Sequence, residues 1–241
     1  MNGSDTASPA SLYRERRPVV PHPLVACQWE QRVGADGYVQ RVLPDACADV
    51  IVSVSGAATV VGPATSVQLP RLPAGERLRG LRFRTAAIGS ALGLPADELR
   101  DLQVPLRDLF PAHEAGRIAD QVWRGELPSF LDPGVRERRV EHALTGLRRQ
   151  VRVAEIADDL GLSARHLRRL VLAHTGLEPR TLARVVRFQR FLDLSDRAAE
   201  PSLAGLAARA GYADQAHLTR EVRALSGLTP SALLAERHRS A

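Results

Sequence analysis

Arginine is the residue type through which this sequence of 241 residues could bind a partner, because its 33 basic residues are all arginines. A guanidinium group presents a planar fork of donors that matches phosphate oxygens and the O6 and N7 atoms of guanine. A GC-rich coding bias would produce the same preference for arginine over lysine. The residue type alone therefore leaves both explanations open.

The positions of the charges are more informative than the residue type. Residues 1–134 contain 14 arginines and 15 acidic residues, a net charge of −1, whereas residues 135–241 contain 19 arginines and 12 acidic residues, a net charge of +7. The excess positive charge thus lies in the C-terminal half, as expected if only that half contacts a polyanion.

An internal repeat organises this basic half. Residues 167–179 (LRRLVLAHTGLEP) and 218–230 (LTREVRALSGLTP) share seven of thirteen residues at an offset of 51, while the helical runs before them align at an offset of 50. Each copy needs a small residue in its first helix and a glycine at a sharp turn, which are the requirements of a helix-turn-helix. These residues are Ala157 and Gly161 in the first copy and Ala207 and Gly211 in the second.

In the first copy, an i, i+3, i+4, i+7 pattern from Leu167 to His174 predicts the core face of the second helix. Ser163 is expected to cap that helix. The residues left outward near its N-terminus, where such a helix enters a major groove, are Ala164, Arg165, Arg168 and Arg169. We expect this unit to supply most of the hydrogen-bonded base reading.

In the second copy, Leu218, Val222 and Leu225 predict the core face. Ala213 holds the place of Ser163, so the one-residue insertion makes Asp214 the expected cap. The outward residues are Gln215, Ala216, Thr219, Arg220 and Arg223. We expect methyl contacts from Ala216 and Thr219. Contact with adenine is expected from Gln215 and with phosphate from Arg223.

The helix predicted between the two copies carries arginines at positions 180, 184, 187 and 190. It can join the two units rigidly. If it holds them about 34 Å apart, one chain could occupy two successive major grooves on one face of the duplex.

The paired units and their connecting helix, above all the segment GYADQAHLTREVRALSGLTPSAL, resemble the AraC/XylS family of regulators over about residues 138–237. The resemblance implies a double helix-turn-helix that binds DNA. It places Arg169 and Arg220 at the family's recurrent arginine, which braces the fold or touches the DNA backbone as well as reading bases. Leu218 and Val222 stand where family members have an aromatic residue, and Ala213 stands where they have a serine.

The N-terminal half predicts an α+β domain, since short β-branched runs from Leu24 to Phe83 predict a small antiparallel sheet and the segments after Arg84 predict helices. The expected organisation is a flexible tail at 1–18, this α+β domain at 19–127, a linker at 128–135 and an all-α domain with two helix-turn-helix units at 136–241. The segments LPDACADVIV, VVGP and GLRFRTAAIGSALGLPADELRD resemble a sensor-like domain of actinobacterial regulators. That resemblance implies signal sensing or dimerisation.

Two other groups of residues were weighed as sites. Arg82 and Arg84 alternate with apolar residues in an expected strand, so they share a face that either binds an anionic effector or pairs with acidic residues. Cys27 and Cys47 are expected to be buried, inert thiols, with a redox switch or a methyl acceptor of the DNA-repair type as alternatives. No cluster has metal-ligand spacing, so no metal and no cofactor are expected.

The expected function is a bacterial, sequence-specific DNA-binding transcription regulator and not an enzyme, since no phosphate loop, nucleophile elbow or nucleophile and base pair is found. Expected partners are double-stranded DNA and RNA polymerase, with a small-molecule effector or a homodimer partner at the N-terminal domain. A cytoplasmic, nucleoid-associated protein without a membrane segment is expected. An enzyme with a DNA-targeting module, such as a repair transferase, and an interaction module that has lost DNA affinity remain alternatives.

Overall fold

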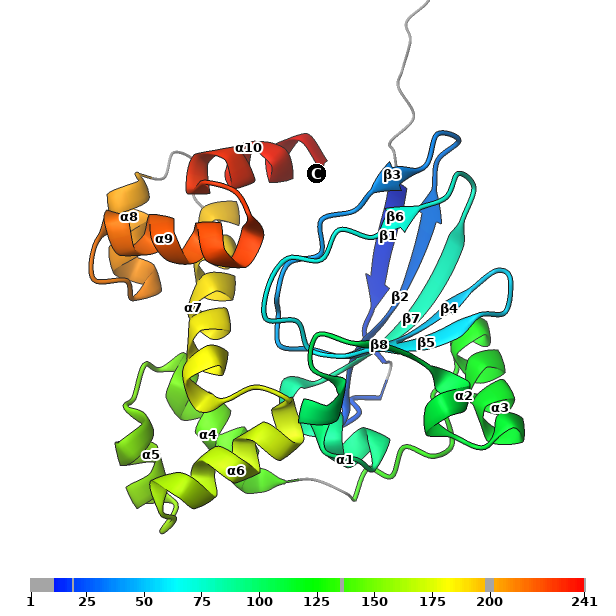
Figure 1. Cartoon of the computed structure of the whole chain (residues 1–241), viewed down its shortest axis with the longest axis horizontal. Coiled ribbons are helices and arrows are strands. Elements are labelled where there is room, and N and C mark those ends of the chain that lie inside the picture. The colour runs from blue at the N-terminus through cyan, green and yellow to red at the C-terminus, as the bar shows by residue number, and fades with distance from the viewer. Residues whose placement is uncertain (1–10, 19, 135–136, 198–201, 241) are drawn as a thin grey trace, which may run out of the picture.

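The β-branched runs of the N-terminal half form an antiparallel sheet in the computed structural model, which describes residues 11–18, 20–134, 137–197 and 202–240 (Figure 1). The strand order is β1-β2-β7-β4-β5-β8. These strands are β1 (Ser11–Arg16), β2 (Val25–Val33), β4 (Asp49–Ser53), β5 (Ala58–Val61), β7 (Arg77–Phe83) and β8 (Gln103–Pro105). A smaller sheet pairs β3 (Tyr38–Val39) with β6 (Arg71–Leu72).

One face of the larger sheet is covered by a helix. Because side chains alternate between the faces of a strand, Val50, Val52 and Leu81 point to the same side. They form a core with Ile118 and Val122 of α3, which packs against β4 and β7. The helical segments of this domain are η1 (Thr85–Ala87), α1 (Ile88–Leu92), η2 (Ala96–Leu99), α2 (Leu106–Leu109) and α3 (Ala112–Arg124).

Three segments differ from what the sequence predicts. Residues 11–16, expected in a flexible tail, pair with β2 instead, and Tyr13 packs on Trp29 with ring centroids 5.6 Å apart. Residues 103–105, between segments expected to be helical, form β8 because β5 offers them an unpaired edge. The expected linker, 128–135, begins inside the N-terminal core, where Phe130 lies 5.2 Å from Phe110 between ring centroids. Residues 1–10 of the expected tail and positions 135–136 lie outside the described residues.

The C-terminal half is helical, so the predicted fold class, an α+β domain followed by an all-α domain, is confirmed. Its helices are α4 (Arg138–Arg148), α5 (Val153–Asp159), α6 (Ala164–Thr175), α7 (Pro179–Asp196), α8 (Leu203–Ala210), α9 (Gln215–Ser226) and α10 (Pro230–Ser240). Figure 1 shows α7 running from the group formed by α4, α5 and α6 to the group formed by α8, α9 and α10. None of the described helices is long and apolar enough to span a bilayer.

The two domains pack directly on one another. Helix α6 lies against η1, α1 and η2, and the buried side chains of Ala46 and Ala86 belong to the core of the helical domain. The Ser90 hydroxyl lies 3.2 Å from His174 Nδ1 of α6. A Cβ on Gly89 would overlap the carbonyl oxygen of Ala173, so the glycine permits this close approach of α1 to α6.

The loop between β3 and β4 contacts the other end of the helical domain. Arg41 Nε donates to Glu236 Oε1 of α10 at 2.7 Å, and Arg41 Nη1 donates to the carbonyl of Ser226 at 2.8 Å. Gln189 Nε2 of α7 donates to the carbonyl of Pro44 at 2.6 Å. The N-terminal domain therefore contacts both groups of helices and the helix that joins them.

Candidate nucleic-acid interface

The first helix-turn-helix consists of α5, a glycine turn and α6. Ala157 is buried at 2% exposure, and its small side chain lets the two helices approach closely. Gly161 has φ of 63°, a left-handed conformation that suits glycine. The Ser163 hydroxyl accepts from the His166 backbone N–H at 3.2 Å, so it caps α6 as expected.

The structure separates the core face of α6 from its outward face as the sequence predicts. Leu167 and Val171 are buried, whereas the proposed DNA-contacting residues of this helix are exposed, namely Ala164, Arg165, Arg168 and Arg169. Arg168 Nη2 donates to Glu178 Oε1 at 2.7 Å. Within the described part of the chain, Arg165 and Arg169 make no ion pair. They are therefore the arginines of α6 that are free to contact a polyanion.

The second helix-turn-helix consists of α8, a glycine turn and α9. Gly211 has φ of 92°, and a Cβ there would overlap the side chain of Gln150, whose Nε2 donates to the carbonyl of Ala210 at 3.1 Å. The Asp214 carboxylate accepts from the His217 backbone N–H at 2.6 Å. The cap thus lies one residue later than in the first unit, as the insertion predicts.

The outward face of α9 is less basic than that of α6. Leu218, Val222 and Leu225 are buried, and the exposed residues among those proposed to contact DNA are Gln215, Ala216, Arg220 and Arg223. Thr219 is half-buried, and its hydroxyl donates to the carbonyl of Gln215 at 2.9 Å. The hydroxyl proton is therefore used within the helix, and the methyl group and the oxygen lone pairs are left for contact with a base.

The structure also shows a basic surface whose role sequence reasoning missed. Arg148 at the end of α4 and Arg152 at the start of α5 line one groove together with four arginines of α7. The spacing of the four α7 arginines, at positions 180, 184, 187 and 190, was the sequence signal for this surface, because steps of three and four place residues on one face of a helix.

Arg82, one of the two residues weighed as an effector site, has acidic partners in the N-terminal domain. Its guanidinium lies 3.1 Å from Asp49 Oδ1, 3.4 Å from Glu15 Oε1 and 3.6 Å from Asp45 Oδ2. Arg84 lies beyond the end of β7 and donates from Nε to the carbonyl of His22 at 3.2 Å. This geometry favours a structural role for the pair over an anion site.

Asp49 is the most buried acid around Arg82. Burial raises the pKa of the Asp49 carboxyl to about 6, although the charge of Arg82 and the hydrogen bond from the Trp29 indole at 2.7 Å both act to lower it. On balance the charged form of this carboxyl is disfavoured, because its burial outweighs the two partners that stabilise it.

The two thiols do not have the properties of a nucleophile. Both cysteines are free, and burial raises the pKa of Cys27 to about 11 and raises that of Cys47 as well. A high pKa keeps a thiol protonated near neutral pH, and the thiolate is the reactive form. This disfavours a methyl acceptor or redox centre at either cysteine. In the described residues no group of three or more His, Cys, Asp or Glu could hold a metal ion.

Two protein families match the chain. Residues 156–236 match the family described as Helix-turn-helix domain, and residues 22–105 match a family described as Domain of unknown function (DUF6597). No curated protein matches the chain significantly.

Several solved structures are similar to the chain. A probable AraC family transcriptional regulator from Rhodopseudomonas palustris is 21% identical, with 43% of this chain and 98% of that chain covered and a TM-score of 0.37. The C-terminal domain of AraT, a response regulator from Geobacillus stearothermophilus, is 19% identical, with coverage of 42% and 87% and a TM-score of 0.39. ToxT from Vibrio cholerae is 13% identical, with coverage of 94% and 97% and a TM-score of 0.44.

The helix-turn-helix match covers both repeated units, from the first helix of the first unit into α10. Each unit has the small alanine, the turn glycine and the capped second helix described above. Over residues 156–236, the C-terminal region of this chain is a helix-turn-helix domain.

Proposed function

We propose that this protein is a sequence-specific transcription regulator that places α6 and α9 in two successive major grooves of one DNA duplex. The observation that carries the proposal is the pair of capped helices whose outward faces are exposed, in a domain with the family's DNA-binding fold. A recognition helix contacts base edges with residues near its N-terminus. Both exposed sets lie there except for Arg223, which is in the last turn of α9.

The linker helix supports simultaneous binding by both units. Helix α7 has 18 residues, which corresponds to about 27 Å at 1.5 Å per residue. Successive major grooves on one face of a duplex are about 34 Å apart. A continuous helix of this length can hold two recognition helices at a separation close to one turn of DNA, especially if the DNA bends towards the protein.

The two units would divide the work. Arg165 and Arg169 would contact guanine or phosphate from α6, with Arg168 joining them only if its ion pair with Glu178 opens. From α9, Gln215 would contact adenine and the methyl groups of Ala216 and Thr219 would contact thymine. Arg220 and Arg223 would contact phosphates.

The N-terminal domain would control how the two units are held, in response to an effector or to self-association. This part of the proposal is supported by its contacts with α6 at one end and with α7 and α10 at the other. RNA polymerase would be the further partner of such a regulator at a promoter.

The test is fluorescence anisotropy on a DNA site selected from a random pool, with Arg165→Ala compared with Arg107→Ala, an exposed arginine of α2 that serves as a charge-matched control. Loss of one good base contact lowers affinity about 5- to 150-fold, or about 1–3 kcal/mol. We expect Arg165→Ala to relax sequence preference in one half of the site, and Arg107→Ala to leave it unchanged.

Two outcomes would contradict the proposal. If Arg165→Ala keeps the sequence preference of wild type, Arg165 does not contact a base. If the wild-type protein shows no preference for the selected site over random DNA, it is not a sequence-specific regulator. This result would favour the alternative of an interaction module that has lost DNA affinity.

A further inference from the structure

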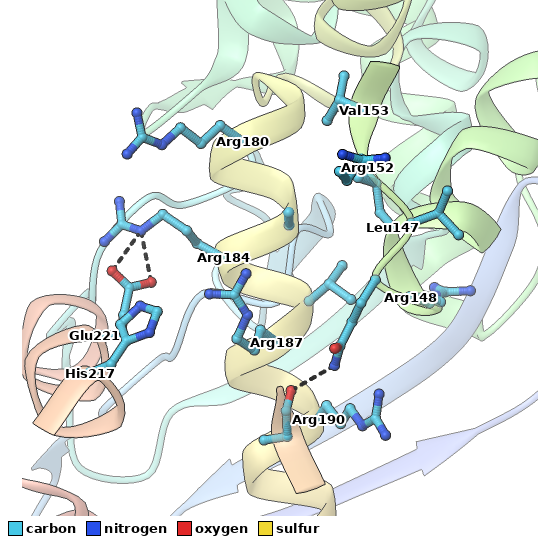
Figure 2. A pocket seen from close by; sticks show the side chains of 15 residues that line it. Leu147, Arg148, Arg152, Val153, Arg180, Arg184, Arg187, Arg190, His217 and Glu221 are labelled. Atoms are coloured by element: carbon cyan, nitrogen blue, oxygen red, sulfur yellow. Dashed lines mark hydrogen bonds and ion pairs between the residues drawn. The ribbon is translucent and has the colours of Figure 1, made fainter. Parts of the chain in front are cut away.

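A groove of about 680 Å³ lies along α7, between the first and the second helix-turn-helix unit (Figure 2). One wall is formed by the end of α4, the α4–α5 connection and the start of α5. The other wall is formed by His217 and Glu221 of α9. The arginines that line it are Arg148, Arg152, Arg180, Arg184, Arg187 and Arg190.

The charges of this groove are poorly balanced. Glu221 is its only acidic lining residue among the described ones, and Arg184 Nε donates to both of its carboxylate oxygens at 3.0 and 2.9 Å. Arg152 pairs with Glu155 outside the lining, at 2.5 Å. In the described ranges, Arg148, Arg180 and Arg190 have neither an ion pair nor a hydrogen bond to another side chain. The groove therefore presents an excess of positive charge to whatever enters it.

The arginines of α7 form a row rather than a cluster. Positions 180, 184, 187 and 190 are separated by four, three and three residues, so they share one face of the helix over about 15 Å. Figure 2 shows these side chains spread along α7 beside the open space of the groove. Such a row is much longer than a single phosphate group and suits an extended polyanion.

The groove adjoins the surfaces that the proposed function assigns to DNA. Arg220, an exposed residue of the outward face of α9, lies three residues after His217 in the groove wall, and residues with this spacing are neighbours on a helix. Arg152 is the N-cap residue of α5, the first helix of its unit. In helix-turn-helix proteins this first helix crosses the DNA backbone.

We propose that this groove binds the phosphate backbone of the DNA segment that lies between the two contacted major grooves. The inference rests on the proposed function and adds a third contact region to it. Duplex DNA carries one negative charge per about 1.7 Å of its axis, so a row of arginines along α7 meets several phosphates at once. The contact carries no base information. It contributes affinity equally on all sequences.

The test compares Arg180→Gln/Arg190→Gln with Arg107→Gln/Arg117→Gln, which removes the same charge from exposed positions of the N-terminal domain. Binding is measured on the selected site and on random duplex DNA between 50 and 300 mM salt, a range of about sixfold that resolves the slope of log affinity against log salt. Each lost phosphate contact lowers the magnitude of that slope by about 0.9. On both DNAs, we expect the magnitude of the salt slope of the groove variant to be about 1.8 lower than that of wild type, while its preference for the selected site is unchanged. The control variant should keep the wild-type slope.

Arg180→Lys/Arg190→Lys is the rescue variant, because lysine also neutralises a phosphate. The lysine variant should restore most of the salt slope. For the glutamine variant, a helical circular dichroism spectrum equal to that of wild type shows that the protein is folded. A wild-type slope in the folded glutamine variant overturns the inference while leaving the proposed function intact. So does an altered sequence preference without a change of slope. A wild-type protein that does not bind DNA overturns both proposals.

Discussion

Relative to the repeat, α9 begins one residue later than α6, and the side chain that caps it accounts for this shift. Ser163 caps α6, while in the second unit the equivalent position is Ala213 and the carboxylate of Asp214 accepts the backbone N–H of His217. An acidic cap also interacts favourably with the positive end of the helix dipole. The inserted residue therefore moves the start of α9 without leaving its first turn unsatisfied.

Asp214→Ala should lower the free energy of unfolding by about 1 kcal/mol, because it leaves a backbone donor at the N-terminus of α9 without its acceptor. Urea denaturation followed by circular dichroism measures this loss. Asp214→Ser should recover most of the stability, since serine caps helices about as well as aspartate. Equal stability of Asp214→Ala and wild type would show that the cap contributes nothing to this helix.

At the scale of the element, the two ends of α6 differ in what they contact. Its N-terminal part presents Arg165 and Arg169 to solvent, whereas its C-terminal part packs against η1, α1 and η2 of the N-terminal domain. His174 sits in this second part beside Ser90. The same helix is thus both a proposed recognition helix and the main contact between the domains.

The packing of α6 should weaken in acid through His174. Burial lowers the pKa of His174 below its ordinary value, with the charge of Arg139 acting in the same direction and that of Glu137 opposing it. The unfolded chain then binds a proton at a higher pH than the folded chain does. The stability contributed by neutral His174 is complete above about pH 6.5 and is lost as the pH falls through the lowered folded pKa.

Urea denaturation of His174→Gln and wild type at several values from pH 7.5 to pH 5 measures this effect. We expect wild type to lose more stability than His174→Gln over this range. The same substitution at the exposed His142 of α4 is the control and should behave as wild type does. Parallel pH profiles for wild type and His174→Gln would rule out protonation of His174 as a cause.

At the scale of the whole molecule, the loop between β3 and β4 of the N-terminal domain reaches the second unit. Arg41 bridges to Glu236 of α10 and to the carbonyl of Ser226 at the end of α9, and the carbonyl of Pro44 accepts from Gln189 of α7. Together with the contact at α6, these bonds connect the N-terminal domain to both units.

Arg41→Ala should lower the local stability of the second unit and leave that of the first unit unchanged. Hydrogen exchange measured by mass spectrometry should be faster in peptides from α9 and α10 and unchanged in peptides from α6, because the Arg41 contacts end at residues 226 and 236. Arg71→Ala, at an exposed position in β6, is the matched control. Uniform acceleration in both units would mean that Arg41 supports the whole fold rather than one contact.

The sequence by itself determined the local features of the DNA-binding domain. The core and outward faces of α6 and α9, the turn glycines 161 and 211 and the shift of the cap to Asp214 all followed from residue spacing. These features depend on residues within about one or two helical turns of each other, and the 3.6-residue period makes them visible in the chain. The strands β2 and β7 were visible as well, because turn residues bound the short runs that form them.

Tertiary structure alone decided the features that join distant residues. The edge strands β1 and β8 are stabilised by their partners in the sheet, and neither has a strong pattern of its own. The Arg168–Glu178 pair, the docking of α6 on the N-terminal domain and the arginine groove along α7 likewise depend on how elements pack. The bond between Arg41 and Glu236 spans 195 residues of chain. Apart from the helical spacing of the arginines in α7, these features leave no periodic signal in a sequence, because they arise only when the hydrophobic cores of both domains bring the elements together.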